Sequence, residues 1–184
     1  MRKVVVSEFI SLDGVIENPA WTFQFQSPEQ DNFKFAELRD ADSLLLGRVT
    51  YEGFAQAWPG MAAETGEYGE WMNGYPKYVA STTLDTGEWN ASIIKGDLAE
   101  AVNALKRQEG KDILVFGSGK LAETLMRLDL VDEYRLIVYP IVLGEGQKLF
   151  VDNIAATLRL VKSEVFSSGA VALTYQTAPK EEAE

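Results

Sequence analysis

The sequence predicts an α/β fold built on a mixed sheet that is mostly parallel, with an antiparallel edge at its carboxyl-terminal end. Two observations support this prediction. From residue 4 to residue 128, apolar runs of strand length alternate with segments of helical periodicity. From residue 134 to residue 175, the chain contains strand patterns only. We therefore expect a central parallel sheet that ends in a hairpin.

Strand and helix signals alternate through the first half of the chain. Ser27 is a typical N-cap, and Pro28 is typical of a first helical turn. Gly47 joins a short apolar strand to the next helix, and Pro59 with Gly60 should stop that helix. The predicted elements are a strand at 4–10, a turn at 12–14, a helix at 28–40, a strand at 43–46 and a helix from 50 to 58.

The same alternation continues in the second half until the helices cease. Ser167, Ser168 and Gly169 are turn residues between the last two strands, which therefore form a hairpin. The predicted elements are a strand at 78–80, a helix at 98–107, a strand at 113–116, a helix at 122–128, and strands at 134–139, 158–166 and 171–175.

The composition excludes several kinds of chemistry. Cysteine and histidine are both absent, which excludes disulfides and thiolate chemistry and removes the commonest general base, and we expect no metal site. Any proton transfer must use carboxylates, tyrosine, lysine or water. The formal charge of -11 opposes binding to nucleic acid or to an anionic membrane.

The length of 184 residues fits one domain, which we place at residues 1–178. The charged end, residues 179–184, is expected to be a disordered tail. The apolar residues before Ser7 and Glu8 are too few for a signal-peptide core or a membrane-spanning helix. The expected location is therefore the cytoplasm.

The segment Gly117-Ser118-Gly119 follows an apolar strand and opens a helix, which is a design that binds phosphate. Two glycines let the backbone approach an anion, and the amides and dipole at the helix start attract it. Lys120 and Leu121 continue this segment into the helix. The alternative is a tight packing turn without a ligand.

Two further loops follow predicted strands and carry groups that bind phosphate. Gly47-Arg48 precedes a helix start, and Arg48 could fork onto a phosphate such as the 2′-phosphate of NADPH. Ser81, Thr82 and Thr83 offer three hydroxyls at the carboxyl end of a strand, where open α/β sheets bind ligands. The alternatives are a surface arginine and a turn made by hydroxyl residues.

Asp31 is the leading candidate for proton transfer, since we expect its carboxylate on the helix face that also carries Phe35 and Leu38. A carboxylate on an apolar face needs a partner, and a ligand ring nitrogen would be one. A solvated aspartate at a helix start is the alternative. Asp13 either contacts the substrate or builds its turn, and Trp21, in a segment read as loop together with Phe23, either covers a planar ligand or packs within the loop.

These loops, in this order, resemble the dihydrofolate-reductase-like superfamily, which includes dihydrofolate reductases and the reductase domain of bacterial riboflavin biosynthesis. The likeness runs from about residue 4 to residue 175. The segments that carry it are Gly47-Arg48-Val49-Thr50-Tyr51-Glu52, Ser81-Thr82-Thr83, Gly117-Ser118-Gly119-Lys120-Leu121 and Pro140-Ile141-Val142-Leu143-Gly144-Glu145-Gly146.

The resemblance implies a three-layer fold with helices on both faces of the sheet, and NADPH as the cofactor. The implied cofactor-binding residues are Ile16, Gly47, Arg48, Thr50, Ser81, Thr82, Thr83, Gly117, Ser118, Gly119, Lys120 and Leu121. Asp31 lies sixteen residues before Gly47, like the substrate carboxylate of dihydrofolate reductases, and the implied substrate contacts are Asp13, Trp21 and Phe35. Val15 stands where riboflavin-type reductases usually have lysine, so the resemblance does not name the substrate.

The function expected from these features is a reductase that transfers a hydride from NADPH to a planar nitrogen heterocycle, such as a pterin, a pyrimidine or a flavin. One alternative is a non-catalytic module that binds the dinucleotide, and another is a structural or partner-binding domain. The apolar residues 136–139, together with the resemblance, also predict a homodimer.

Overall fold

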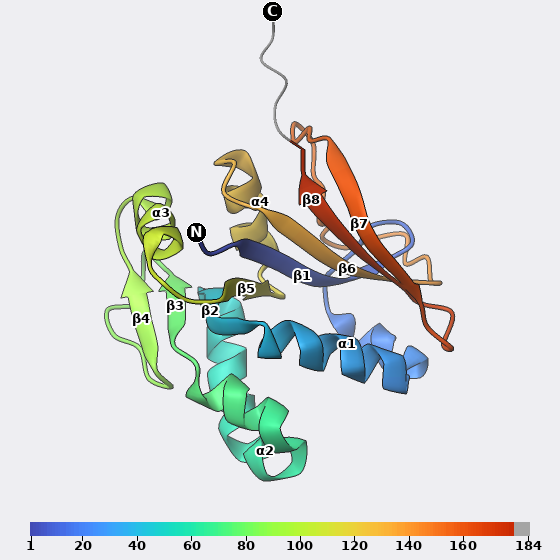
Figure 1. The fold of residues 1–184 in the computed structure, drawn as a ribbon, viewed down its shortest axis with the longest axis horizontal. Coiled ribbons are helices and arrows are strands. Elements are labelled where there is room, and N and C mark those ends of the chain that lie inside the picture. Colours follow the sequence, from blue (N-terminus) through green and yellow to red (C-terminus); the bar gives the residue numbers. More distant parts are fainter. Residues whose placement is uncertain (179–184) are drawn as a thin grey trace, which may run out of the picture.

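The computed structural model describes residues 1–178 as a three-layer α/β fold (Figure 1). The predicted tail at 179–184 lies outside the described residues. The strands are β1 (Val4–Ser11), β2 (Ala41–Gly47), β3 (Lys77–Ala80), β4 (Ala91–Ile94), β5 (Asp112–Phe116), β6 (Glu133–Tyr139), β7 (Leu158–Val165) and β8 (Val171–Thr177). The helices are η1 (Pro19–Phe25, 3-10), α1 (Pro28–Arg39), α2 (Arg48–Gly74), α3 (Leu98–Arg107) and α4 (Gly119–Arg127).

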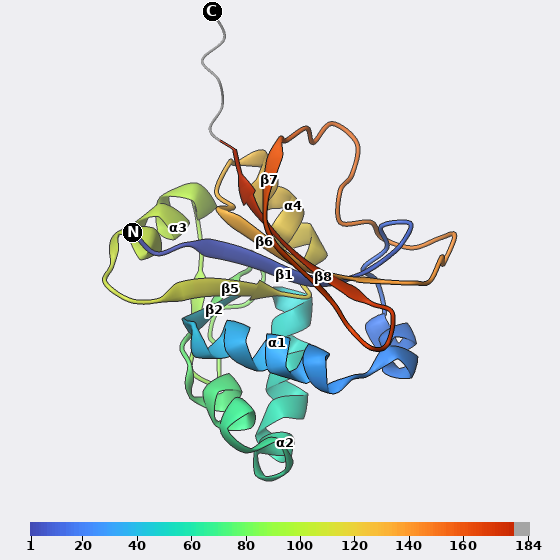
Figure 2. The same ribbon diagram turned by 45° about the vertical axis from the view of Figure 1, so that its right-hand side comes forward.

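All eight strands form one sheet in the order β4-β3-β2-β5-β1-β6-β8-β7. The pairs from β4 through to β6 are parallel, whereas β8 and β7 pair antiparallel at one edge. The predicted mixed sheet with an antiparallel carboxyl-terminal hairpin is therefore confirmed. In Figure 2 the β7–β8 hairpin is seen in front of the neighbouring strands, and it continues the sheet beside β6.

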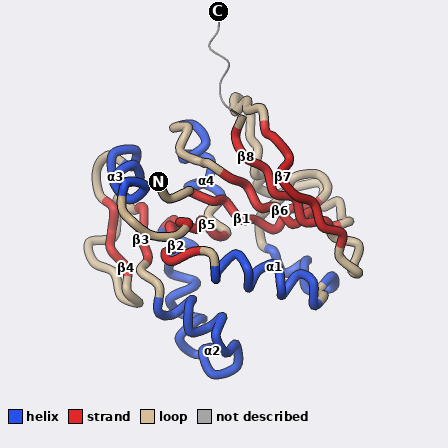
Figure 3. The backbone as a smooth tube through the Cα atoms, in the orientation of Figure 1, coloured by secondary structure: helices blue, strands red, loops and turns tan. Residues whose placement is uncertain are grey.

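Helices cover both faces of the sheet, as predicted (Figures 1 and 3). Helices α3 and α4 pack on the face that carries Val4, Val6 and Ile10 of β1. Helices α1 and α2 pack on the opposite face, where Val5 contributes to a second core. Because side chains alternate along a strand, Glu8 belongs to the α4 face and Ser7 to the α1 face.

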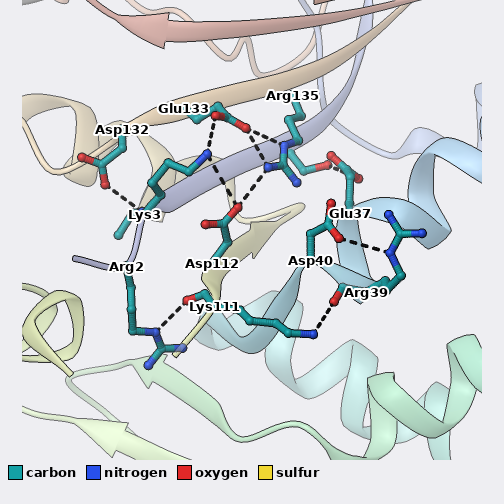
Figure 4. A network of polar contacts seen from close by, with 12 residues as sticks. Arg2, Lys3, Glu37, Arg39, Asp40, Lys111, Asp112, Asp132, Glu133 and Arg135 are labelled. Atoms are coloured by element: carbon teal, nitrogen blue, oxygen red, sulfur yellow. Dashed lines mark hydrogen bonds and ion pairs between the residues drawn. The ribbon is translucent and has the colours of Figure 1, made fainter. Parts of the chain in front are cut away.

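Charged side chains form ion pairs at the amino-terminal ends of the parallel strands (Figure 4). Lys3 Nζ lies 2.8 Å from Glu133 Oε2, and Arg135 lies 2.7 Å from Glu133 and 3.0 Å from Asp112. Burial acts to raise the pKa of Glu133, but the lysine and arginine outweigh it and lower that pKa overall. This network ties β1, β5 and β6 together at the edge away from the Gly117–Gly119 loop.

Local sequence signals place several elements closely. The Ser27 hydroxyl accepts a hydrogen bond from the Gln30 amide and caps α1, as predicted. Helix α3 occupies residues 98–107, and the Asp97 carboxylate caps it. Helix α4 begins at Gly119, three residues before its predicted start, because the loop glycine already has helical hydrogen bonding after Ser118.

Three predictions about elements are wrong. Helix α2 does not stop at Pro59 but runs on to Gly74, and its helical geometry breaks at Gly66, where φ is 56°. A proline removes only one backbone donor, and here the stacking of Trp58 on Tyr68, with ring centroids 5.7 Å apart, joins the two halves. Strand β4 was not predicted, and the segment holding Trp21 and Phe23 forms the 3-10 helix η1, not a loop.

Candidate functional site

The three predicted phosphate loops lie at one edge of the sheet. They follow β2, β3 and β5, which are neighbouring parallel strands, so their carboxyl ends meet at the same edge. The strand β1 ends beside them and leads into the loop that holds Ile16. The sheet order thus gathers segments far apart in the sequence, as open α/β sheets do at their ligand-binding crevices.

The loop at Gly47 and the loop at Gly117 are directly connected. The Gly47 amide donates a 3.0 Å hydrogen bond to Ser118 Oγ, and the Thr50 hydroxyl donates one of 3.0 Å to the Gly117 carbonyl. Gly117 has φ 56°, a conformation that L side chains rarely adopt. Thr50 and Ser118 therefore hold the two loops in one arrangement.

A cavity of about 410 Å³ lies between Arg48 and the hydroxyl loop. Its lining includes Ser81, Thr82, Thr83 and Gly96. The Arg48 guanidinium is exposed and forms an ion pair of 2.9 Å with Glu52 one turn along α2. A cation and three hydroxyl residues thus surround one space beside a helix start.

Ser81 also has a local structural role. Its hydroxyl accepts hydrogen bonds from the amides of Thr83, at 3.2 Å, and Leu84, at 3.0 Å. This is the turn-building role that the sequence left open. Thr82 and Thr83 are exposed at the cavity, so their hydroxyls face its space or solvent.

The loop after β1 reaches the start of α4. A Cβ on Gly119 would lie only 2.7 Å from Ile16 Cδ1 and from Gln147 Nε2, so both side chains pack closely against this glycine. The Ile16 amide donates to the Gln147 carbonyl at 2.9 Å, and the Gln147 amide donates to Glu17 Oε2 at 3.0 Å. Gln147, which the sequence reading missed, therefore positions Ile16 beside the glycine loop.

The remaining residues of the glycine loop divide between core and surface. Leu121 is buried in the same core cluster as Ile16 and Leu125 of α4, whereas Lys120 is exposed. Leu121 therefore anchors the start of α4, and Lys120 places a positive charge near it.

Asp13 fastens two loops. Its carboxylate accepts hydrogen bonds from the Ser11 hydroxyl at 2.7 Å and from the amides of Leu143 and Gly144 at 3.1 and 2.8 Å. The Ser11 hydroxyl and these two amides lower the pKa of Asp13 to about 2. The structure thus gives Asp13 the turn-building contacts that the sequence left as an alternative to substrate contact.

Asp31 is exposed, at the amino end of the helix face that also carries Phe35 and Leu38. Leu38 is buried in the second core and Phe35 packs on α2, so the expected face is apolar in its later turns, but Asp31 in the first turn lies at the surface. Asp31 lies near Tyr68 of α2, whose pKa is raised by burial and by the charges of Glu37 and Asp31. The role of Asp31 in proton transfer stays a prediction.

The predicted substrate aromatics pack against other rings. Phe35 contacts Trp71 of α2, with ring centroids 4.8 Å apart. Trp21 contacts Tyr139 at 5.5 Å, and its indole N–H donates to the Glu17 carbonyl at 3.0 Å. The Tyr139 hydroxyl in turn donates to Gln30 Oε1 at 2.8 Å, which links η1, β6 and α1.

A buried ion pair of α1 lies against the middle of β1. Lys34 Nζ is 2.6 Å from Glu37 Oε2 and donates to the Ser7 hydroxyl at 2.7 Å, and this hydroxyl donates to Glu37 at 2.9 Å. The ammonium also lies 4.2 Å from the ring centroid of Phe116, which precedes the glycine loop. The sequence signal was a lysine and a glutamate three residues apart on α1, opposite a serine in an apolar strand.

Glu8 is a further group that sequence reading missed. Its residue is 5% exposed, and one carboxyl oxygen, Oε1, is buried without a hydrogen-bond partner. Burial raises the pKa of Glu8 to about 8, although Lys34 and the amides of Ser118 and Gly117 act in the opposite direction. The sequence signal was an acidic residue inside the apolar run of β1.

Within residues 1–178, no helix is long and apolar enough to cross a membrane. In the same part of the chain, no three or more acidic, histidine or cysteine side chains are grouped as a metal ion would require.

Solved structures share this fold over nearly their whole length. A provisionally assigned riboflavin biosynthesis protein from Shewanella sp. PV-4 is 24% identical with a TM-score of 0.78, and the match covers 96% of this chain and 99% of that one. A pyrimidine reductase-like protein from Corynebacterium diphtheriae is 12% identical with a TM-score of 0.67, covering 97% and 93%.

Sequence relatives come from Bacillus subtilis (strain 168). The protein YyaP is 34% identical over 179 residues, which is 95% of this chain and 94% of that protein. The protein YwjB is 30% identical over 183 residues, covering 96% and 99%, and both relatives are described as uncharacterized. The family model of the RibD C-terminal domain matches residues 2–172. The chain belongs to the RibD C-terminal domain family.

Proposed function

We propose that this protein is an NADPH-dependent reductase that delivers a hydride to a planar nitrogen heterocycle, such as a pterin, a pyrimidine or a flavin. Membership of the RibD C-terminal domain family supports a reductase-type role on a small molecule. The observation that carries the proposal is the cavity between Arg48 and residues 81–83, next to the connected loops at Gly47 and Gly117.

The residues at this edge fit a phosphorylated dinucleotide. Arg48 and the hydroxyls of Thr82 and Thr83 would hold the adenosine 2′-phosphate, because a guanidinium fork and hydroxyl donors match phosphate oxygens. The glycine loop at the start of α4 would hold the pyrophosphate. Ile16 would border the nicotinamide, since it packs against Gly119 at the other end of this line of loops.

When bound, NADPH supplies the hydride, and the protein must supply a proton to the reduced ring. Asp31 is the carboxylate proposed from the sequence, with Asp13, Trp21 and Phe35 as substrate contacts. Lys34 Nζ is the buried cation nearest to Phe116, which ends β5 before the glycine loop. We therefore propose Lys34 Nζ, alongside Asp31, as a group that holds a proton for the substrate.

The test is titration of the purified protein with NADPH and with NADH, followed by quenching of tryptophan fluorescence. We expect NADPH to bind more tightly, and Arg48→Ala to weaken NADPH binding by about tenfold to a hundredfold, since a charge-assisted phosphate contact contributes about 1.5 to 3 kcal/mol. NADH binding should hardly change, because it lacks the 2′-phosphate. Equal affinities for both nucleotides, unchanged by Arg48→Ala, would contradict the phosphate assignment.

Glu52→Gln is the matched control for the titration. It removes the carboxylate that pairs with Arg48 at 2.9 Å but keeps the guanidinium. We expect NADPH binding to stay equal or become tighter, because the phosphate no longer competes with Glu52. A loss as large as that of Arg48→Ala would show that the ion pair, and not the cation, matters.

A non-catalytic dinucleotide-binding module is the second candidate, and the exposure of Asp31 favours it. The two candidates differ in turnover. With a panel of pterins, pyrimidines and flavins, a reductase consumes NADPH in single-turnover mixtures, whereas the module leaves the absorbance of NADPH constant.

The homodimer and the cytoplasmic location also stay proposals. The strand at 136–139 does not argue for the homodimer, because β6 lies between β1 and β8 and its residues Leu136, Ile137 and Tyr139 are buried in the chain's own core. The exposed side chains of the edge strand β7, including Leu160, Val161 and Val165, are a more suitable surface for a second copy.

A further inference from the structure

A buried carboxyl group lies beneath the loop proposed to bind phosphate. Glu8 pairs in the sheet next to the end of β5, since its neighbour Ser7 is in register with Phe116, the residue before Gly117. The Glu8 residue is 5% exposed, and its Oε1 has no hydrogen-bond partner. The amides of Ser118 and Gly117 lie close enough to favour its charged form. A buried acid with an unpartnered oxygen therefore lies beside the loop proposed to bind phosphate.

We propose that Glu8 makes dinucleotide binding proton-coupled, so that the Gly117–Gly119 loop accepts a phosphate-bearing ligand only while the Glu8 carboxyl is protonated. This inference rests on the proposed function, because it assigns a second ligand state to the same loop. It predicts that the protein takes up a proton when it binds the dinucleotide at alkaline pH.

Two physical effects support the coupling. An ionised Glu8 would repel a phosphate at the start of α4 in a region of low dielectric constant, where unscreened charges interact strongly. In addition, each of the Ser118 and Gly117 amides has one N–H, which cannot donate a full hydrogen bond to the carboxylate and to a phosphate at the same time. A phosphate that takes these donors removes the stabilisation of ionised Glu8, so the carboxyl gains a proton.

The surroundings of Glu8 offer little compensation for its charge. From α1, Lys34 favours the ionised form, but its ammonium is already paired with Glu37 at 2.6 Å. The neighbouring side chains of Ile10 on β1 and Leu136 on β6 belong to the apolar core of the same face. On α4, Lys120 is exposed. Protonation is therefore the available way to remove the negative charge.

The direction of the pH effect follows from the free protein. Burial raises the pKa of Glu8 to about 8, so the carboxyl is protonated below that pH and ionised above it. If the ionised form does not bind, affinity is constant below the pKa and falls up to tenfold for each pH unit above it. Between pH 7.5 and pH 9.5 we expect NADPH affinity to fall by roughly twentyfold.

The experiment combines titration with calorimetry on the full chain. NADPH affinity is measured from pH 7.5 to pH 9.5, above the range in which a 2′-phosphate, with a pKa near about 6, titrates. Calorimetry at pH 8 in two buffers of different ionisation enthalpy counts protons, and we expect uptake of about half a proton per NADPH. Glu8→Gln should abolish the proton uptake and keep the affinity nearly constant with pH.

Asp112→Asn is the matched control, because Asp112 is a half-buried carboxyl at the opposite end of β5. Its pH profile should follow that of the wild type. Tight wild-type binding with no proton uptake and a flat pH profile overturns this inference but leaves the proposed function standing. Absence of NADPH binding at every pH, in the wild type and in Glu8→Gln, overturns both. The wild-type calorimetry shows whether NADPH binding is coupled to proton uptake even if Glu8→Gln fails to fold.

Discussion

Lys34 and Glu37 form an ion pair that the fold removes almost entirely from water. Their side chains are 15% and 2% exposed, and Ser7 completes the cluster. Such a pair is weak evidence for stability as a whole, since desolvation offsets most of the attraction. Removing one partner, however, leaves an uncompensated charge in the interior. The cluster therefore fixes the position of α1 over the middle of β1.

We predict that Lys34→Met lowers the free energy of unfolding by roughly 3 to 5 kcal/mol, because Glu37 stays buried without its cation. The double variant Lys34→Met, Glu37→Leu should recover most of that loss, because it removes both charges. Urea denaturation of the two variants measures this. If the double variant is as unstable as the single one, the cluster does not depend on charge pairing.

At the scale of single residues, the sequence indicated the residues of the candidate phosphate loops more readily than the buried charged side chains near them. Gly47, Arg48 and Gly117 could be singled out because turn glycines and a basic residue at a helix start are visible in the sequence. Glu8 and Lys34 could not, because their importance depends on which strand lies beside β1 and which face α1 buries. Asp31 shares its helix face with Phe35 and Leu38 as predicted, but its exposure could not be predicted, because it depends on how far the neighbouring elements extend over the first turn of α1.

Helix α2 consists of two helical segments that meet at Gly66. This glycine has φ 56° and ψ -140°, outside the helical region, and a Cβ added to it would have no neighbouring atom within 4 Å. The constraint there is therefore conformational and not steric. The aromatic side chains of both segments pack together and against the second core. The helix axis is therefore interrupted at Gly66, but the two segments remain packed on each other.

We predict that Gly66→Ala lowers the free energy of unfolding by about 1 to 2 kcal/mol, because a left-handed backbone is unfavourable for a residue with a Cβ. Gly60→Ala is the control within the same helix, where open space also surrounds the glycine and no positive φ is present. That change should be neutral or stabilising by up to about 1 kcal/mol. Thermal and urea unfolding compare the two, and an equal response at both positions would contradict the assigned break.

At the level of elements, sequence reading succeeded where signals were local. The capping residue Ser27 and the turn at 167–169 lie at element ends that could be read directly. The prediction that the helix ends at Pro59 was wrong, because the packing of Trp58 stabilises the helix by more than the loss of one backbone hydrogen bond destabilises it. Strand β4 is four residues long, and its pairing with β3 is set by the sheet and not by its own composition.

At the scale of the whole molecule, the order of the strands creates the candidate site. Strands β3, β2, β5 and β1 are adjacent and parallel, so four separate segments end at one edge. The sequence predicted a mostly parallel sheet with an antiparallel end, but strand order depends on long-range pairing that a single sequence does not display. The family resemblance implied the three-layer fold but no strand order, and the family match over residues 2–172 agrees with that resemblance.

The most direct test of the central claim is a crystal structure of the protein with NADPH. We expect the adenosine 2′-phosphate in the cavity between Arg48 and the loop at 81–83, and the pyrophosphate at the amides of the Gly117–Gly119 loop. The nicotinamide should lie beside Ile16. A dinucleotide bound elsewhere, with Arg48 still paired to Glu52 and the glycine loop free of phosphate, would contradict the account.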